Sequence, residues 1–119
     1  MSIEGIWTTE LYGPFGWENH GVYLLENGRM VGGDNRQYSM GTYSVSGDQI
    51  TAELKVYYYG PPRTMFGEEC EEYTIKLDGK LEDDTIGGTI HRLDKPQLDL
   101  QYRWTRRMDL PADVTKTTE

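Results

Sequence analysis

The chain has 119 residues, a length typical of one domain with a single core, and a formal net charge of −8. This acidic balance argues against direct nucleic-acid binding, because such proteins need a basic surface to neutralise phosphates. Two alanines against nine tyrosines and fourteen glycines favour strands over helices, since alanine is the best helix former and tyrosine suits a pleated strand.

Apolar runs and turn signals predict eight strands in chain order. Their ranges are 3–12, 19–26, 29–33, 38–45, 49–59, 69–77, 81–92 and 97–107. Asn27-Gly28 is the strongest hairpin signal, because a type I′ turn needs positive φ at both central residues. Asp78-Gly79 is interpreted as a second hairpin turn of this kind.

Alternation along these strands predicts which side chains point inward. In the strand 49–59 one face carries Ile50, Ala52, Leu54, Val56 and Tyr58. In the strand 97–107, Tyr102 and Trp104 share the apolar face. Eight short strands joined by tight turns favour a meander, and closure of that meander removes its exposed edges. We therefore predict an all-β fold, an eight-stranded antiparallel up-and-down β-barrel of lipocalin-like shape, with a β-sandwich as the alternative.

The predicted barrel is one domain over residues 1–108, followed by a flexible tail at 109–119. Aromatic side chains that could line its interior are Trp7, Tyr43, Tyr102 and Trp104. A barrel of this strand number either is filled by side chains or holds one small ligand, and the sequence leaves both alternatives open.

The sequence shows no pattern typical of a metal, cofactor or catalytic site. The histidines His20 and His91 and the single cysteine Cys70 do not have the spacing of metal ligands, and no nucleophile lies in a recognisable motif. No apolar run is long enough to span a bilayer and no signal peptide is recognised. We therefore expect a non-enzymatic, cytoplasmic protein without a cofactor.

Two clusters are candidates for contact with other proteins. The acidic cluster around Cys70 comprises Glu68, Glu69, Glu71 and Glu72; it is either a patch that captures a basic partner or a solvated strand edge. The aromatic cluster comprises Tyr57, Tyr59 and Phe66; it is either a dimer or partner interface or ordinary packing at the barrel rim.

A series of short motifs carries a family resemblance. The motifs are Gly5-Ile6-Trp7, Gly21-Val22, Asn27-Gly28-Arg29, Gly32-Gly33-Asp34, Gly41-Thr42-Tyr43 and Leu100-Gln101-Tyr102-Arg103. With this ordered series, residues 4–107 resemble the GrlR-like family, the lipocalin-like repressors of bacterial type III secretion and their relatives. The resemblance implies a cytoplasmic, non-enzymatic homodimer that regulates by holding an activator protein without touching DNA.

The family's partner-binding signature is an acidic four-residue run in the loop between the fourth and fifth strands. Here that loop contains Ser46, Gly47 and Asp48, with one carboxylate only. These three residues and the acidic cluster are the candidates for partner binding. We expect a negative-regulator-like protein that binds another protein, such as a transcriptional activator; the alternative is a carrier or sensor of a small apolar ligand.

Overall fold

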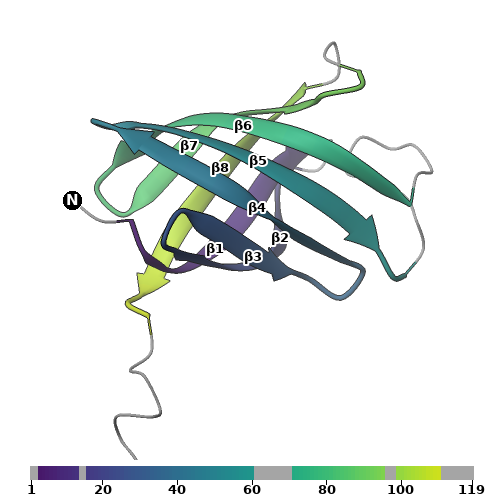
Figure 1. Ribbon diagram of the computed structural model, residues 1–119, viewed down its shortest axis with the longest axis horizontal. Helices are drawn as coiled ribbons and strands as arrows, with labels where there is room; N and C mark the ends of the chain where they lie inside the picture. The colour runs from purple at the N-terminus through teal and green to yellow at the C-terminus, as the bar shows by residue number, and fades with distance from the viewer. Residues whose placement is uncertain (1–2, 14–15, 61–70, 96–98, 111–119) are drawn as a thin grey trace, which may run out of the picture.

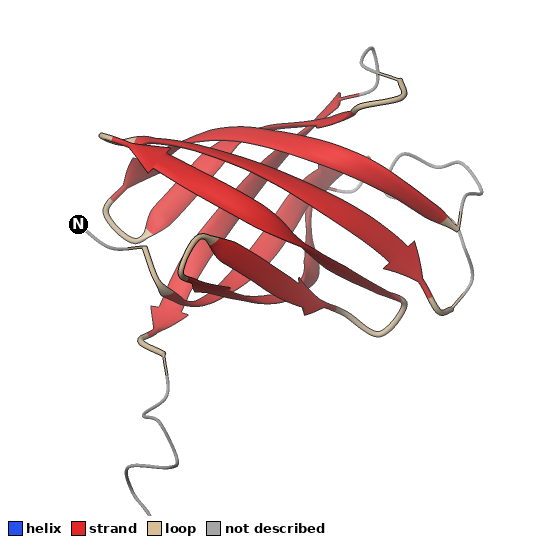
Figure 2. Cartoon of the chain, viewed as in Figure 1, coloured by secondary structure: helices blue, strands red, loops and turns tan. Residues whose placement is uncertain are grey.

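A computed structural model describes residues 3–13, 16–60, 71–95 and 99–110, which form strands and no helix (Figures 1 and 2). The strands are β1 (Gly5–Gly13), β2 (Gly16–Glu26), β3 (Arg29–Gly33), β4 (Gln37–Ser46), β5 (Gln49–Tyr58), β6 (Glu72–Glu82), β7 (Thr85–Arg92) and β8 (Asp99–Met108). Each pairs antiparallel with its neighbours in sequence, and β1 also pairs with β8. The predicted closed up-and-down barrel is confirmed, and the sandwich alternative is wrong.

The two ends of the barrel differ. At the closed end, strands are joined by the tight turns 27–28, 47–48 and 83–84, which lie on the left in Figure 1. At the opposite end, called the mouth here, β1, β3, β5 and β7 end. The predicted turn at Asn27-Gly28 is confirmed, with φ of 54° and 76°. Both values lie in the left-handed region that Asn and Gly tolerate best.

The prediction of a hairpin turn at Asp78-Gly79 is wrong, because β6 continues through both residues to Glu82. The turn is formed instead by Asp83 and Asp84. Gly79 has a packing role: a Cβ at this position would overlap the hydroxyl of Tyr102. Tyr102 lies in the same row two strands away, with Gly88 between the two residues. The glycine therefore makes room for a large aromatic side chain.

Smaller differences concern strand ends. β2 begins at Gly16, three residues earlier than predicted, because Tyr12 pairs with Trp17 and their rings contact edge to face at 5.3 Å. β6 begins at Glu72. Of the predicted tail, residues 111–119 lie outside the described residues.

The core fills the barrel and follows the predicted alternation. Its buried apolar members are Ile3, Trp7, Leu11, Tyr23, Leu25, Met30, Ile50, Ala52, Leu54, Val56, Tyr73, Ile75, Leu77, Ile86, Ile90, Tyr102 and Trp104. Every strand except β4 contributes a member, and β4 adds the half-buried Tyr43 at the edge of the cluster. Burial of this single cluster is the main force that holds the ring of strands together.

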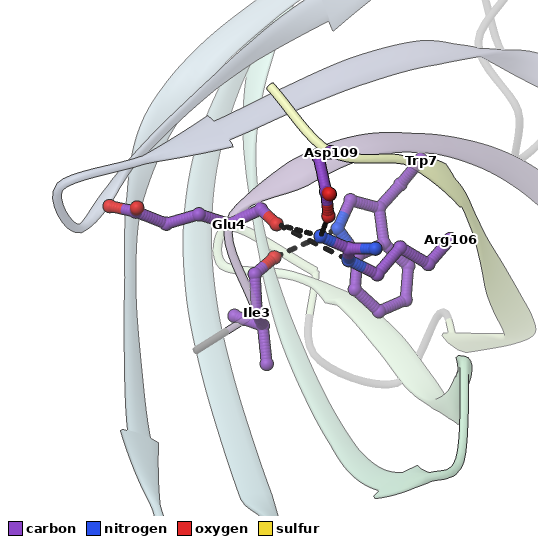
Figure 3. A network of polar contacts seen from close by, with 5 residues as sticks. All are labelled: Ile3, Glu4, Trp7, Arg106 and Asp109. Carbon is purple, nitrogen blue, oxygen red and sulfur yellow. Dashed lines mark hydrogen bonds and ion pairs between the residues drawn. The ribbon is translucent and has the colours of Figure 1, made fainter. Parts of the chain in front are cut away.

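The N-terminal segment is fastened at the closed end (Figure 3). The indole Nε1 of Trp7 donates to the carbonyl of Ile3 at 2.9 Å. The guanidinium of Arg106 donates to the carbonyl of Glu4 from Nη2 at 2.8 Å and from Nε at 3.2 Å, and Nη2 also contacts Asp109 at 2.6 Å. These bonds link the segment before β1 to the end of β8.

Candidate functional site

The aromatic residues predicted to line the interior lie mostly in the core. Trp7, Tyr102 and Trp104 are buried, and Trp104 packs against the other two rings at centroid distances of 6.5 and 5.2 Å. Tyr43 is half-buried and packs against the core from its edge. The alternation therefore predicted the inward orientation of Tyr102 and Trp104 correctly.

A small cavity remains among these side chains. Its volume is about 30 Å³, and its lining includes Trp104, Leu77, Tyr23, His20 and Gln37. That space holds about one or two water molecules, whereas pockets for small organic ligands measure about 300–1,000 Å³. Among the described residues, the space around this cavity is thus filled by side chains of the core.

Polar side chains gather in the mouth half of the interior. Gln37 Nε2 lies 3.1 Å from Nδ1 of His20, and the hydroxyls of Tyr23 and Ser39 are 2.6 Å apart. Burial lowers the pKa of His20, and burial raises the pKa of Tyr23 to about 12 despite its bond to Ser39. Both groups are therefore neutral at pH 7 and act here as hydrogen-bonding partners.

A buried cation, Arg92, lies in the same mouth half of the interior, at the end of β7. Arg92 is buried, with its guanidinium 4.9 Å from the centre of the Tyr73 ring. It also donates two hydrogen bonds to the carboxylate of Asp94, at 3.0 and 2.9 Å. The hydrogen bond from Arg92 holds the pKa of Asp94 below its usual range. Arg92 is thus placed by an aromatic face and a carboxylate, a combination that stabilises a buried guanidinium.

The two sets of residues predicted to bind a partner lie far apart. Ser46, Gly47 and Asp48 form the exposed β4–β5 turn at the closed end, where Asp48 lies 3.9 Å from Lys80. Of the acidic cluster, Glu71 and Glu72 are exposed at the mouth end of β6, whereas Glu68 and Glu69 lie outside the described residues. The length of β5, ten residues, separates the two sets by about 30 Å, at roughly 3.3 Å per residue, so they do not form one site.

The structure does bring the acidic cluster next to two of the predicted interface tyrosines. Tyr57 lies directly opposite Glu72 in the β5–β6 ladder and opposite Tyr38 in the β4–β5 ladder. The ring of Tyr38 stacks on Tyr57 at 5.2 Å and lies 6.1 Å from Tyr59. Tyr59 is anchored by its hydroxyl, which donates to the carbonyl of Asp34 at 2.6 Å. Phe66 lies outside the described residues.

Tyr38, Tyr57 and Tyr59 form one side of a larger surface. We call the apolar face the outward side chains of β2, β3 and β4 with these tyrosines: Val22, Leu24, Val31, Tyr38, Met40, Tyr57 and Tyr59. Leu24, Val31 and Met40 form one row across the three strands. Half of the large apolar residues that are exposed in the described part of the chain belong to this face. Such concentration on one side is typical of an interaction site.

The apolar face is hollowed at its border toward the closed end. A depression of about 380 Å³ is lined by Leu24, Val31 and Met40, with Glu26 and Arg29 toward the closed end. Met40 is 54% exposed and Tyr59 is 62% exposed. Sequence reasoning missed this surface because each strand contributes only one or two of its residues, and only the register between strands joins them.

Outside the apolar face, the described surface combines ion pairs with other exposed apolar residues, such as Tyr12, Trp17 and Met108. Arg103 on β8 contacts Glu10 on β1 at 2.6 Å and lies over the ring of Trp17 at 4.2 Å. His91 on β7 lies 3.9 Å from Asp78 on β6. These pairs have the character of solvated strand faces.

The described residues contain neither a metal-binding cluster nor a membrane-spanning helix. They contain no group of three or more histidine, cysteine, aspartate or glutamate side chains that could hold a metal ion. Over the same ranges, the chain forms no helix long and apolar enough to cross a membrane.

No family model matches the chain, and no curated protein matches it either.

Proposed function

We propose that this is a non-enzymatic regulatory protein that acts by binding another protein through its apolar face. The observation that carries the proposal is the clustering of Val22, Val31, Tyr38, Met40 and Tyr59, half of the exposed large apolar residues in the described part of the chain, on one side of the barrel. A surface of this kind costs free energy while it faces water, and a partner that covers it recovers that free energy.

The filled interior supports surface binding over the alternative of a small apolar ligand. The internal cavity of about 30 Å³ is roughly a tenth of the smallest usual ligand pocket. A carrier function would require the core around Trp104 and Leu77 to rearrange. The described geometry thus favours the protein-binding hypothesis.

The resemblance to the GrlR-like family supplies further parts of the proposal. It suggests a cytoplasmic homodimer and a negative regulator whose partner is an activator protein. The turn Ser46–Gly47–Asp48 carries one carboxylate where that family has an acidic run. We therefore place partner binding on the apolar face and its acidic border instead of on this turn.

Native mass spectrometry of tagged protein from cells that naturally produce it tests the proposal. Wild type, Met40→Asp and Met108→Asp would be compared, because both methionines are 54% exposed but only Met40 belongs to the apolar face. The expected result is a homodimer with one additional, reproducible protein mass in wild type and Met108→Asp, and loss of that mass in Met40→Asp.

Two results would overturn this assignment. A protein mass retained equally by both variants would place the binding site elsewhere. An added mass of only a few hundred daltons would instead identify a carrier of a small ligand.

A further inference from the structure

We propose that the partner segment that occupies the apolar face is a basic amphipathic α-helix. This inference rests on the proposed function and names the chemistry of the partner. It follows from three properties of the face: the absence of a free strand edge beside it, the arrangement of its apolar rows and the excess of carboxylates on its border.

The closed ring of strands restricts how a partner can bind. β2, β3 and β4 each pair with a strand on both sides, and the ring is completed by β1 with β8. Over residues 22–25, 29–33 and 38–42, which carry Val22, Leu24, Val31, Tyr38 and Met40, each strand is paired on both sides, whereas residues 16–21 of β2 and 43–46 of β4 have no partner in β3. Along the paired stretch a partner strand therefore has no edge to extend, and recognition by strand addition is excluded there. The partner must bind through side chains.

The apolar rows match the side of a helix. Leu24, Val31 and Met40 span three neighbouring strands, a width of about 10 Å at roughly 4.8 Å per strand. An α-helix with its side chains is about 10–12 Å across. Its apolar residues at i, i+3, i+4 and i+7 form one stripe, which would lie along the depression between Leu24 and Met40.

Methionine suits this kind of contact. Met40 has an unbranched, polarisable side chain that adapts to different apolar shapes, and methionine is abundant on surfaces that bind amphipathic helices. Tyr38 extends the apolar surface toward the mouth, where its ring is stacked on Tyr57. The contact area available to a helix thus continues from the depression to the tyrosines.

The border of the face carries more carboxylates than cations. The acidic residues are Glu26, Asp34, Glu53, Glu71 and Glu72, and the basic residues are Arg29, Arg36 and Lys55. The whole chain has a net charge of −8. A field of this sign attracts a basic segment and speeds its association.

Lys55 shows how this border holds a cation. Its Nζ lies 5.6 Å from the centre of the Tyr57 ring and 3.8 Å from the carboxylate of Glu72. The aromatic face and the opposite charge both stabilise an ammonium group at this position. Lysine or arginine side chains on the flanks of a bound helix would meet the same two kinds of group along Tyr38, Tyr59 and Glu53.

A designed peptide tests the inference without knowledge of the natural partner. The probe is a synthetic Leu/Lys helix of about 18 residues (five turns) with leucine on one stripe and lysine elsewhere. One control peptide has glutamate in place of each lysine, and a second has the same composition without the stripe. Binding would be measured by fluorescence anisotropy, and the site would be mapped by amide chemical shifts.

The expected result is binding of the Leu/Lys helix with shifts in β2, β3 and β4. Met40→Asp should weaken it at least about tenfold, as expected for a central contact residue, and Met108→Asp by less than about twofold. The two variants add the same charge, so general attraction to the acidic protein changes equally in both. Their melting temperatures should agree closely, because both side chains are exposed.

Three results would overturn the inference: no binding of the Leu/Lys helix, equal binding of the glutamate or stripe-free peptide, or equal weakening by the two variants. If one of these occurs while a natural partner is lost with Met40→Asp, the proposed function stands and only the helical, basic character of the partner is wrong. If the natural partner still binds the Met40→Asp variant as it binds wild type, the proposed function itself is wrong.

Discussion

At the scale of single residues, the polar groups inside the mouth make the fold sensitive to pH. His20 is largely buried beside Gln37, with Glu18, Asp34 and Arg36 as its charged neighbours. Burial lowers the pKa of His20 below the ordinary value of 6.5; Asp34 opposes this effect and Arg36 adds to it. The folded protein therefore takes up the proton less readily than the unfolded chain does.

The first prediction concerns the stability of the fold in mild acid. Below pH 6.5 the unfolded chain binds more protons at His20, so the free energy of unfolding falls as the pH falls, by at most about 1.4 kcal/mol per pH unit for one proton. The loss stops below the folded-state pKa. His20→Asn, whose amide oxygen can still accept from Gln37, should reduce this slope in urea unfolding between pH 7.5 and 5.

His91→Asn on the outer side of β7 is the matched control. In His91→Asn, the fall in the free energy of unfolding between pH 7.5 and 5 should not become smaller in the way that it does in His20→Asn. Equal slopes in His20→Asn and wild type would show that another group causes the acid sensitivity.

A second prediction at this scale concerns the buried hydroxyl of Tyr102. It has no hydrogen-bond partner among the described residues, and burial raises the pKa of this tyrosine. Tyr102→Phe removes a desolvated polar group and should stabilise the fold by about 1 kcal/mol.

Because the hydroxyl lies where a Cβ of residue 79 would be, Gly79→Ala should lower the free energy of unfolding of the wild type by about 1–3 kcal/mol.

A double-mutant cycle measured by urea unfolding checks this coupling. The cost of Gly79→Ala should be smaller in the Tyr102→Phe background by at least about 0.5 kcal/mol, as is usual for residues in contact. Additive costs would mean that the neighbours Ile86 and Gly87, and not the hydroxyl, resist the added Cβ.

At the scale of elements, the β6–β7 hairpin has a two-residue loop that its sequence does not suit. Asp83 has a φ of 55°, in the left-handed region, where a non-glycine residue is disfavoured. Asp83→Gly should therefore raise the free energy of unfolding, by about 0.5 kcal/mol. Asp84→Gly, where φ is not positive, should lower it, because glycine only adds freedom to the unfolded chain there. Thermal unfolding of both variants checks the prediction, and stabilisation by Asp84→Gly would contradict it.

The elements also show what the sequence could predict and what it could not. Alternation along one strand predicted the inward faces of β5 and β8, and Asn27-Gly28 predicted the first hairpin. The turn predicted at Asp78-Gly79 was wrong, because local turn preference does not reveal that the hydroxyl of Tyr102 needs the space beside Gly79. The apolar face escaped prediction because it depends on which residues of different strands lie side by side, as Tyr38 and Tyr57 do.

At the scale of the whole molecule, the barrel has two different sides. The ion pairs Arg103–Glu10 and His91–Asp78 lie on strands away from the apolar face. Exposed pairs of this kind contribute little to stability, so their main effect is to keep that side solvated. The proposed partner would thus bind the side formed by β2, β3 and β4.

The last prediction concerns closure of the ring. β1 and β8 are joined from opposite ends of the sequence, and Arg106 ties them by donating to the carbonyl of Glu4 and to Asp109 (Figure 3). Arg106→Gln should lower the free energy of unfolding by about 1 kcal/mol. It should also speed hydrogen exchange of the amides of Ile6 and Trp7, because the segment before β1 loses its attachment.

Arg107→Gln is the control at the neighbouring position. Arg107 is exposed and donates to the hydroxyl of Thr8 at 2.9 Å, a contact whose loss should cost less than about 0.5 kcal/mol. If both variants lose the same stability, or if exchange at Trp7 is unchanged in Arg106→Gln, then β1–β8 pairing alone closes the barrel. A selective effect of Arg106→Gln would show that a single guanidinium at the closed end holds the first and last strands in register.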